Sequence, residues 1–284
     1  MPRPARRQPA PSPAALLRHG FLVAVALFTV LPFVWMLSAA AKTSGEILQG
    51  GLSLLPGHPG TLIENLARVF AEVPLGLYMA NGVFVCTAIL ALQLLIAIPC
   101  AYALAKLRFK GRGPLFGLVL LGLLVPVQVT ALPIYVLCYV SGLTNSYWAL
   151  VLPFVASAFG IFLFRQFFVT LPDSVLEAAR LDGLGETEIV WRIAAPAARP
   201  AIAAFSIFSV IFHWNDLFWP LIVITDQTVA TPPLGIVFFR NQEAGEDFAA
   251  LMAASVVVTA PMVLVFLLTQ RRFVEGIALS PFRK

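Results

Sequence analysis

The sequence predicts an all-α protein that crosses a membrane with six helices. Hydrophobic residues make up 60% of the 284 positions and charged residues only 12%, and the mean hydropathy is +0.89. A water-soluble domain cannot hide so much apolar surface in one core. The apolar residues also cluster into stretches of about 20, the length that a helix needs to cross the hydrocarbon core with its backbone groups satisfied.

Six such stretches follow one another along the chain. They run over residues 20–41, 78–105, 115–139, 147–168, 201–224 and 248–269. Prolines interrupt most of them, including Pro99, Pro126, Pro133 and Pro220. Membrane helices tolerate proline because neighbouring helices satisfy the freed carbonyls. We therefore expect six spans, several of them kinked.

The first stretch has two interpretations. Basic Arg6 and Arg7, the apolar run and the alanines at 39–41 resemble a cleavable signal peptide. The apolar region of a signal is usually only about 7 to 15 residues long, so the longer run here favours a retained helix. The proline- and arginine-rich residues 1–14 are predicted to form a disordered tail, which leaves residues 15–284 as one transmembrane domain.

Lysine and arginine residues set the predicted orientation, because basic residues near helix ends stay on the cytoplasmic side. With the N-terminus inside, only Lys42, Arg68 and Arg240 lie in outer loops. Both termini are therefore predicted to be cytoplasmic and the protein to reside in the cell inner membrane. The predicted inner set comprises Arg3, Arg6, Arg7, Arg18, Lys106, Arg108, Lys110, Arg112, Arg165, Arg180, Arg192, Arg199, Arg271, Arg272, Arg283 and Lys284.

No metal site, cofactor motif or catalytic group is predicted. The three histidines are far apart in the sequence and lack ligand spacing. The three cysteines, Cys86, Cys100 and Cys138, lie in apolar stretches and are predicted to be small buried hydrophobes. Nucleophile–base pairs and carboxylate dyads are not apparent, so an intramembrane enzyme fits poorly.

The cytoplasmic loop at about 171–199 separates the fourth and fifth spans. A helix is predicted to begin near Pro172, with Ser174 and Glu177 as a capping box, and to end at Leu181. Gly183 and Gly185 are expected to adopt positive φ angles. A second helix, 186–194, ends before a proline and carries apolar residues at helical spacing. Its apolar face would lie on lipid, on its own bundle or on a partner.

The amino-acid sequence of this loop resembles the EAA loop of ABC importer permeases. The family pattern is EAA, three residues, G, nine residues and then I-x-L-P. This chain matches it with Glu177-Ala178-Ala179, with Gly183 and with residues 193–196, where Ala195 stands in place of the leucine. The run HWNDLFWPL at 213–221 is similar to a signature of carbohydrate permeases. The segments 251–255 and 270–278 resemble the maltose-type second permease, although the ending LSPFRK departs from that family's tail.

The resemblance implies a type I importer permease fold for a sugar-like solute. It also implies Glu177, Ala178, Ala179, Asp182 and Gly183 as the element that docks on a separate ATPase. The implied partners are a second permease in a heterodimer, two ATPase subunits, an extracytoplasmic solute-binding protein and lipid, with no nucleic acid. The chain has no G-x-x-x-x-G-K-[ST], so ATP hydrolysis would belong to those partners.

Few polar residues interrupt the apolar spans. Gln93, Gln128, Asn215 and Asp216 either line a solute path or form interhelical hydrogen bonds. Proton- or ion-driven carriers usually place several ionisable residues in the membrane, whereas Asp216 is nearly alone here. A secondary transporter for a small polar solute is the alternative function.

Overall fold

The computed structural model describes residues 13–50, 53–55, 59–242 and 247–278, and this part is helical, with no strand. The predicted all-α class is confirmed. Most of the tail predicted over 1–14, and the ending LSPFRK, lie outside the described residues. Pro13 and Ala14 are the first residues of helix α1.

The chain divides into two compact units. The first contains residues 1–72 and 245–256, and the second contains residues 73–244 and 257–284. The helices of the first unit are α1 (Pro13–Ala40), α2 (Ser44–Gln49) and α3 (Pro59–Glu72), and α15 (Phe248–Ala278) begins in this unit and ends in the second.

Polar bonds hold the first unit together at one end of α1. Asn65 in α3 is buried, and its side-chain amide donates to the carbonyl oxygens of Ala40 and Lys42, both at 2.9 Å. Asp247 accepts from Ser44 and pairs with Arg68, each at 2.8 Å. The rest of α1 is mostly exposed and apolar, as expected for a helix that faces lipid.

The second unit holds most of the helices. They are α4 (Leu75–Lys106), α5 (Arg112–Leu124), α6 (Val127–Val140), α7 (Tyr147–Val151), η1 (Leu152–Phe154), α8 (Ala158–Val169), α9 (Asp173–Leu181), α10 (Glu186–Ile189), the π-helical turn η2 (Val190–Ala194), α11 (Ala195–Ala197), α12 (Arg199–Trp214), α13 (Phe218–Val223), η3 (Gln227–Val229) and α14 (Pro232–Gln242).

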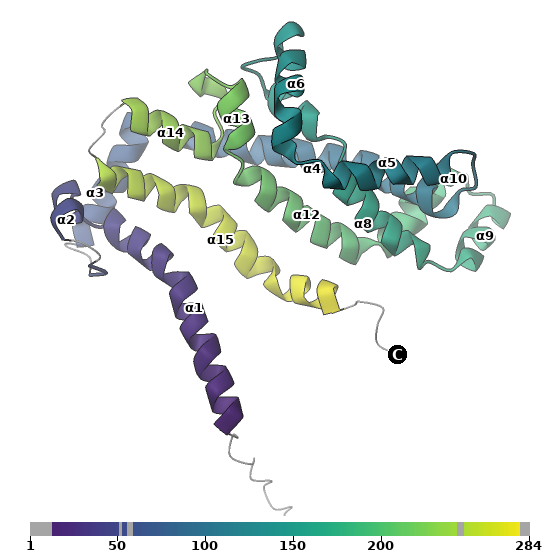
Figure 1. The fold of residues 1–284 in the computed structure, drawn as a ribbon, viewed down its shortest axis with the longest axis horizontal. Helices are drawn as coiled ribbons and strands as arrows, with labels where there is room; N and C mark the ends of the chain where they lie inside the picture. The colour runs from purple at the N-terminus through teal and green to yellow at the C-terminus, as the bar shows by residue number, and fades with distance from the viewer. Residues whose placement is uncertain (1–12, 51–52, 56–58, 243–246, 279–284) are drawn as a thin grey trace, which may run out of the picture. The chain divides into compact units, whose positions relative to one another are not determined.

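Helix α4 is the axis of the second unit. It packs against α8 and α12, which lie alongside it in Figure 1. Small residues make the approach close, because a Cβ added at Gly160 in α8 would lie 2.9 Å from the ring of Phe205 in α12. Phe164, Phe168 and Tyr102 fill the part of this core near the C-terminal end of α4 and are almost fully buried.

Among the described residues, four helical segments are long and apolar enough to span a membrane, and the number rises to six if two bent helix pairs each count as one span. The predicted third span is not one helix: α5 and α6 meet at 101°. Pro126 stands at this break and lacks the amide hydrogen that a continuous helix needs. The predicted fifth span also differs, because α12 ends at Trp214 and α13 is separate.

One further expectation needed correction. Cys86 and Cys138 are buried, as predicted, but Cys100 is exposed on α4. Helices α2, α3 and α14 lie between the predicted spans.

Candidate functional site

The loop between α8 and α12 begins with the predicted helix, α9, which follows Pro172 and ends at Leu181. The capping box expected from Ser174 and Glu177 is absent from α9, whose N-cap is Pro172 without a side-chain bond. Asp173 instead accepts a hydrogen bond from Lys106, in α4, at 2.6 Å. The start of α9 is therefore fixed by a tertiary contact and not by a local cap.

Gly183 ends α9 in the way the sequence predicts. Its φ is +86°, a conformation that residues with a Cβ adopt at a cost. The amide of Leu184 donates to Ala179 O and that of Gly183 to Arg180 O, which is the Schellman pattern. Gly185 does not have the expected positive φ; its value is −73°.

The residues of the EAA-like element lie on two different faces of α9. Glu177, Ala178, Asp182 and Gly183 are exposed, whereas the side chain of Ala179 is buried with the core below the helix. Leu181 adds an apolar side chain that is 89% exposed. We call the exposed group Glu177, Ala178, Leu181, Asp182 and Gly183 the α9 surface.

The second half of the loop packs on its own bundle. Ile189 and Val190 are buried in the core around Phe164 and Phe168, which decides between the three locations considered for this apolar face. The helical turns also continue past Pro196 to Ala197 through the π-helical turn η2, so the expected end before the proline is wrong. The wider π turn accommodates a proline that would break a regular α-helix.

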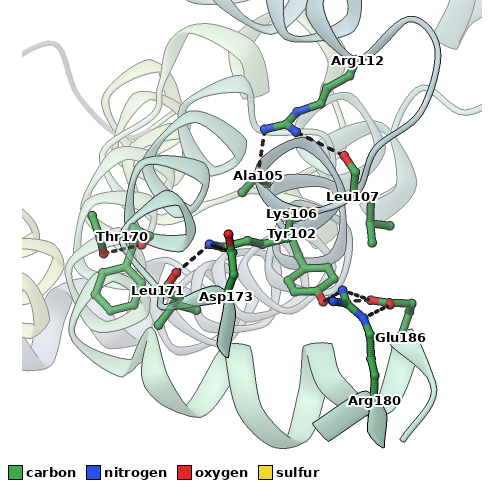
Figure 2. A network of polar contacts seen from close by, with 11 residues as sticks. Tyr102, Ala105, Lys106, Leu107, Arg112, Thr170, Leu171, Asp173, Arg180 and Glu186 are labelled. Carbon is green, nitrogen blue, oxygen red and sulfur yellow. Dashed lines mark hydrogen bonds and ion pairs between the residues drawn. The ribbon is translucent and has the colours of Figure 1, made fainter. Parts of the chain in front are cut away.

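Polar contacts join α9 to the C-terminal end of α4 (Figure 2). Lys106 donates to Asp173 and to the carbonyl oxygen of Leu171, both at 2.6 Å. The hydrogen bond and the charge of Lys106 lower the pKa of Asp173. At the other end of α9, Arg180 pairs with Glu186 at 2.8 Å, and this hydrogen bond raises the pKa of Arg180.

A pocket of about 490 Å³ opens between α4, the α5–α6 break and α12. Its lining is mostly apolar and aromatic and includes Phe154, Phe159, Phe212 and Trp219. Its polar side chains include those of Gln93, Thr130, Ser157, Ser209 and His213, and none of the described lining residues is Asp, Glu, Lys or Arg. A mostly apolar cavity of this size with a few polar groups is typical of a small-molecule site.

Gln93 ties three elements together at this pocket. Its amide nitrogen donates to Phe154 O at 2.8 Å and lies 3.4 Å from Nε2 of His213. Its carbonyl oxygen accepts from the hydroxyl of Ser209 at 2.7 Å. Gln93 therefore forms interhelical hydrogen bonds and also lines this pocket, and its place in a solute path stays a prediction.

The other polar candidates lie outside this lining. Gln128 is exposed near the start of α6. Asn215 donates back to Ile211 O at 2.7 Å, and Asp216 accepts from the amide of Trp219 at the start of α13. Sequence reasoning missed Ser209 and His213 as site residues. Their spacing of four residues in an apolar helix, which places both on one face, was the available signal.

The described chain is helical, with apolar spans and a helical loop between two of them. It also has a mostly apolar pocket with a few polar side chains. These features define a polytopic membrane transport component. The match in sequence is specific: residues 93–278 match the family described as "Binding-protein-dependent transport system inner membrane component". The chain belongs to this family.

Relatives and a solved structure extend the comparison over nearly the whole chain. The arabinooligosaccharides transport system permease protein AraQ of Halalkalibacterium halodurans is 33% identical, with 97% of this chain and 98% of the relative covered. The diacetylchitobiose uptake system permease protein NgcG of Streptomyces coelicolor is 34% identical, with 95% and 89% covered. The sn-glycerol-3-phosphate transport system permease protein UgpE of Yersinia pestis is 34% identical, with 91% and 94% covered.

A bacterial ABC transporter involved in the import of the acidic polysaccharide alginate contains a chain of similar fold. The TM-score is 0.82 at 22% identity, with 94% of this chain and all of the other covered. This likeness confirms the predicted importer permease fold.

Proposed function

We propose that this chain is a permease subunit of an ATP-driven importer for a neutral, sugar-like solute, and that the α9 surface binds a separate ATPase subunit. The partners in this proposal are a second, similar permease, two ATPase subunits and an extracytoplasmic solute-binding protein. Both chain termini lie in the cytoplasm, on the same side as α9. Family membership and the three permease relatives support this function.

The observation that carries the docking proposal is the chemistry of the α9 surface. Leu181 exposes most of its side chain, and the carboxylate of Glu177 has no polar partner within the described part of the chain. An exposed apolar side chain beside an unpaired carboxylate suits a partner that covers the leucine and supplies a cation. Ala178 and Gly183 add no bulk that would hold such a partner away, and Ala179 supports the helix from below.

Replacing Glu177 with lysine tests this proposal. The purified complex should lose its ATPase subunits, because the new charge would face the partner's cation. Thr187→Lys places the same charge on exposed α10 and should retain them. ATPase subunits that stay bound to Glu177→Lys, with normal hydrolysis, would overturn the docking role. Uptake that persists without any ATPase and follows the proton gradient would instead support the secondary transporter.

The pocket supports the solute class. Hydroxyl-rich solutes need a few neutral hydrogen-bonding groups among apolar walls, which Gln93, Ser209 and His213 provide. An anionic solute would leave its charge without a cationic partner among the described lining residues, and burying an unpaired charge is costly. We therefore propose a neutral sugar over a phosphorylated one, with Gln93 in the path and Gln128, Asn215 and Asp216 in structural roles.

Reconstituted complexes distinguish these solutes. With the cognate binding protein present, lactose, arabinotriose and glycerol 3-phosphate would be compared as stimulators of ATP hydrolysis. A neutral sugar should stimulate, and glycerol 3-phosphate should not. Stimulation by glycerol 3-phosphate alone would overturn the proposed solute class and leave the docking proposal standing.

A further inference from the structure

Helix α9 is attached to a single membrane helix at both of its ends. At its start, Lys106 of α4 contacts Asp173 and Leu171 O, each at 2.6 Å. The Lys106 side chain is only 7% exposed, whereas that of Asp173 is 75% exposed. The first attachment is therefore a charge-assisted contact whose lysine is shielded from water and whose carboxylate is open to it.

The second attachment lies one turn earlier in α4, at the other end of α9. The hydroxyl of Tyr102 donates to Oε2 of Glu186 at 2.8 Å, and Oε1 of the same carboxylate accepts from Arg180, in the last turn of α9. The ring of Tyr102 is 1% exposed and packs edge-on against Phe168. Figure 2 shows the Glu186 carboxylate close to both the Tyr102 hydroxyl and the Arg180 guanidinium group.

The end of α4 that receives these contacts is itself braced. Arg112 donates to the carbonyl oxygens of Leu104 and Ala105 at 2.8 and 2.9 Å, and Arg165 of α8 donates to Leu104 O at 3.2 Å. The last carbonyls of a helix have no intrahelical donors and carry the negative end of its dipole. The two arginines therefore stabilise the C-terminal end of α4, to which α9 is attached.

We infer that Tyr102 and Lys106 are positioning residues that make α9 move with α4 as one body. This inference rests on the proposed docking of α9 on an ATPase. The same helix carries Gln93 nine residues before Tyr102, or about 14 Å along its axis. When the ATPase displaces α9, α4 moves with it, and Gln93 at the pocket moves with α4.

Two conservative variants separate attachment from docking. Tyr102→Phe keeps the buried ring and removes the hydroxyl, and Lys106→Met keeps the side-chain length and removes the charge. Both leave the α9 surface intact, so the purified complexes should retain their ATPase subunits. In proteoliposomes, the solute moved per ATP hydrolysed should fall by about ten-fold in each single variant and by more in the double variant, because each lost charge-assisted bond shifts the attached state by about ten-fold.

Two further variants serve as controls. Lys106→Arg restores a cation at the same position and should recover coupling. Arg192→Gln removes an exposed ion pair with Glu188 that lies within the loop, four residues apart, and should leave coupling unchanged.

A spectroscopic measurement reports attachment directly. Nitroxide labels at exposed Ser174 in α9 and exposed Cys100 in α4 should give a narrow distance distribution in the parent protein and a broad one in the double variant. An unchanged distribution together with unchanged solute per ATP in the double variant would overturn the inference. If Glu177→Lys keeps its ATPase subunits while the labels still report broadening, the docking proposal fails and the attachment stands.

Discussion

The side-chain amide of Gln93 donates to the carbonyl oxygen of Phe154 at 2.8 Å, a bond that joins two residues 61 positions apart in the chain. This bond, together with the one from Ser209, satisfies a buried polar group in an apolar helix. Interhelical hydrogen bonds in membranes contribute about 0.6 to 1.7 kcal/mol each. Gln93 therefore stabilises the bundle as well as lining its pocket.

Gln93→Leu should lower the free energy of unfolding by about 1 to 3 kcal/mol, because Phe154 O and Ser209 lose their partner. Controlled denaturation in detergent measures this change. Gln166→Leu, on an exposed position of α8, is the matched control and should have little effect. Equal stabilities for the two variants would contradict the role of Gln93.

Gly183→Ala should cost about 1 to 2 kcal/mol, because alanine at φ +86° brings its Cβ against the backbone. Gly185→Ala should cost less, since φ there is −73° and no atom lies within 4 Å of an added Cβ. Denaturation of the two variants compares them, and membrane insertion should be normal in both. A larger loss for Gly185→Ala would contradict the turn geometry.

Gly82→Val should loosen the packing of α14 on α4. An added Cβ at Gly82 would lie 2.6 Å from the ring of Pro232 and 3.2 Å from that of Trp214. Overpacking of this kind costs about 1 to 3 kcal/mol. Gly76→Val, on the same helix with nothing within 4 Å, is the control. Thermal unfolding of the complex should place Gly82→Val clearly below Gly76→Val.

The Lys106–Asp173 contact should respond to acid. Because Lys106 lowers the pKa of Asp173, the contact contributes stability above the unfolded pKa, near 4, and loses it as pH falls through the lower folded value. Hydrogen exchange at the start of α9 should therefore show constant protection from pH 7 to about 4, and less protection below that.

Two substitutions examine the origin of that transition. Asp173→Asn should lower protection at neutral pH to about the level that the parent protein shows in acid, and it should abolish the acid transition. Asp182→Asn, at the other end of α9, should leave the transition in place. An acid transition that survives in Asp173→Asn would show that another group causes it.

The proposed topology predicts the accessibility of single cysteines. In a cysteine-free background, a cysteine replacing exposed Glu188 should react with a membrane-impermeant reagent only from the cytoplasm. One replacing Glu72 at the end of α3 should react only from outside. Labelling of position 188 from outside would reverse the orientation of the whole chain.

Much of the fold was predictable because lipid selects spans by composition alone. The ranges predicted around α1, α4, α8 and α15 agree with the structure. Hydropathy does not report the direction of a helix axis, however, so it did not reveal the 101° turn at Pro126. Proline alone could not reveal the turn either, because Pro99 lies inside the unbroken α4.

The site was predictable to the extent that it depends on local sequence. The end of α9 and the conformation of Gly183 follow from neighbouring residues, whereas the start of α9 also depends on the contact with Lys106. Which of Ala178 and Ala179 faces outward depends on what α9 packs against, and the contact between Tyr102 and Glu186 joins positions 84 apart. Such contacts arise from tertiary packing and leave no signal in a single sequence.

The break between α5 and α6 has a consequence for hydration. The final carbonyls of α5 and the first amides of α6 lack partners within their own helices, and hydrocarbon offers none. Leu124 is 77% exposed and Val125 47% exposed, so no described part of this chain covers their side chains at the break. Either a second protein chain or water must solvate that backbone. Val125 and Gln93 line the same pocket, so water that enters at the break reaches Gln93. A hydroxyl-rich solute that enters the pocket therefore leaves bulk water for a cavity that is itself hydrated.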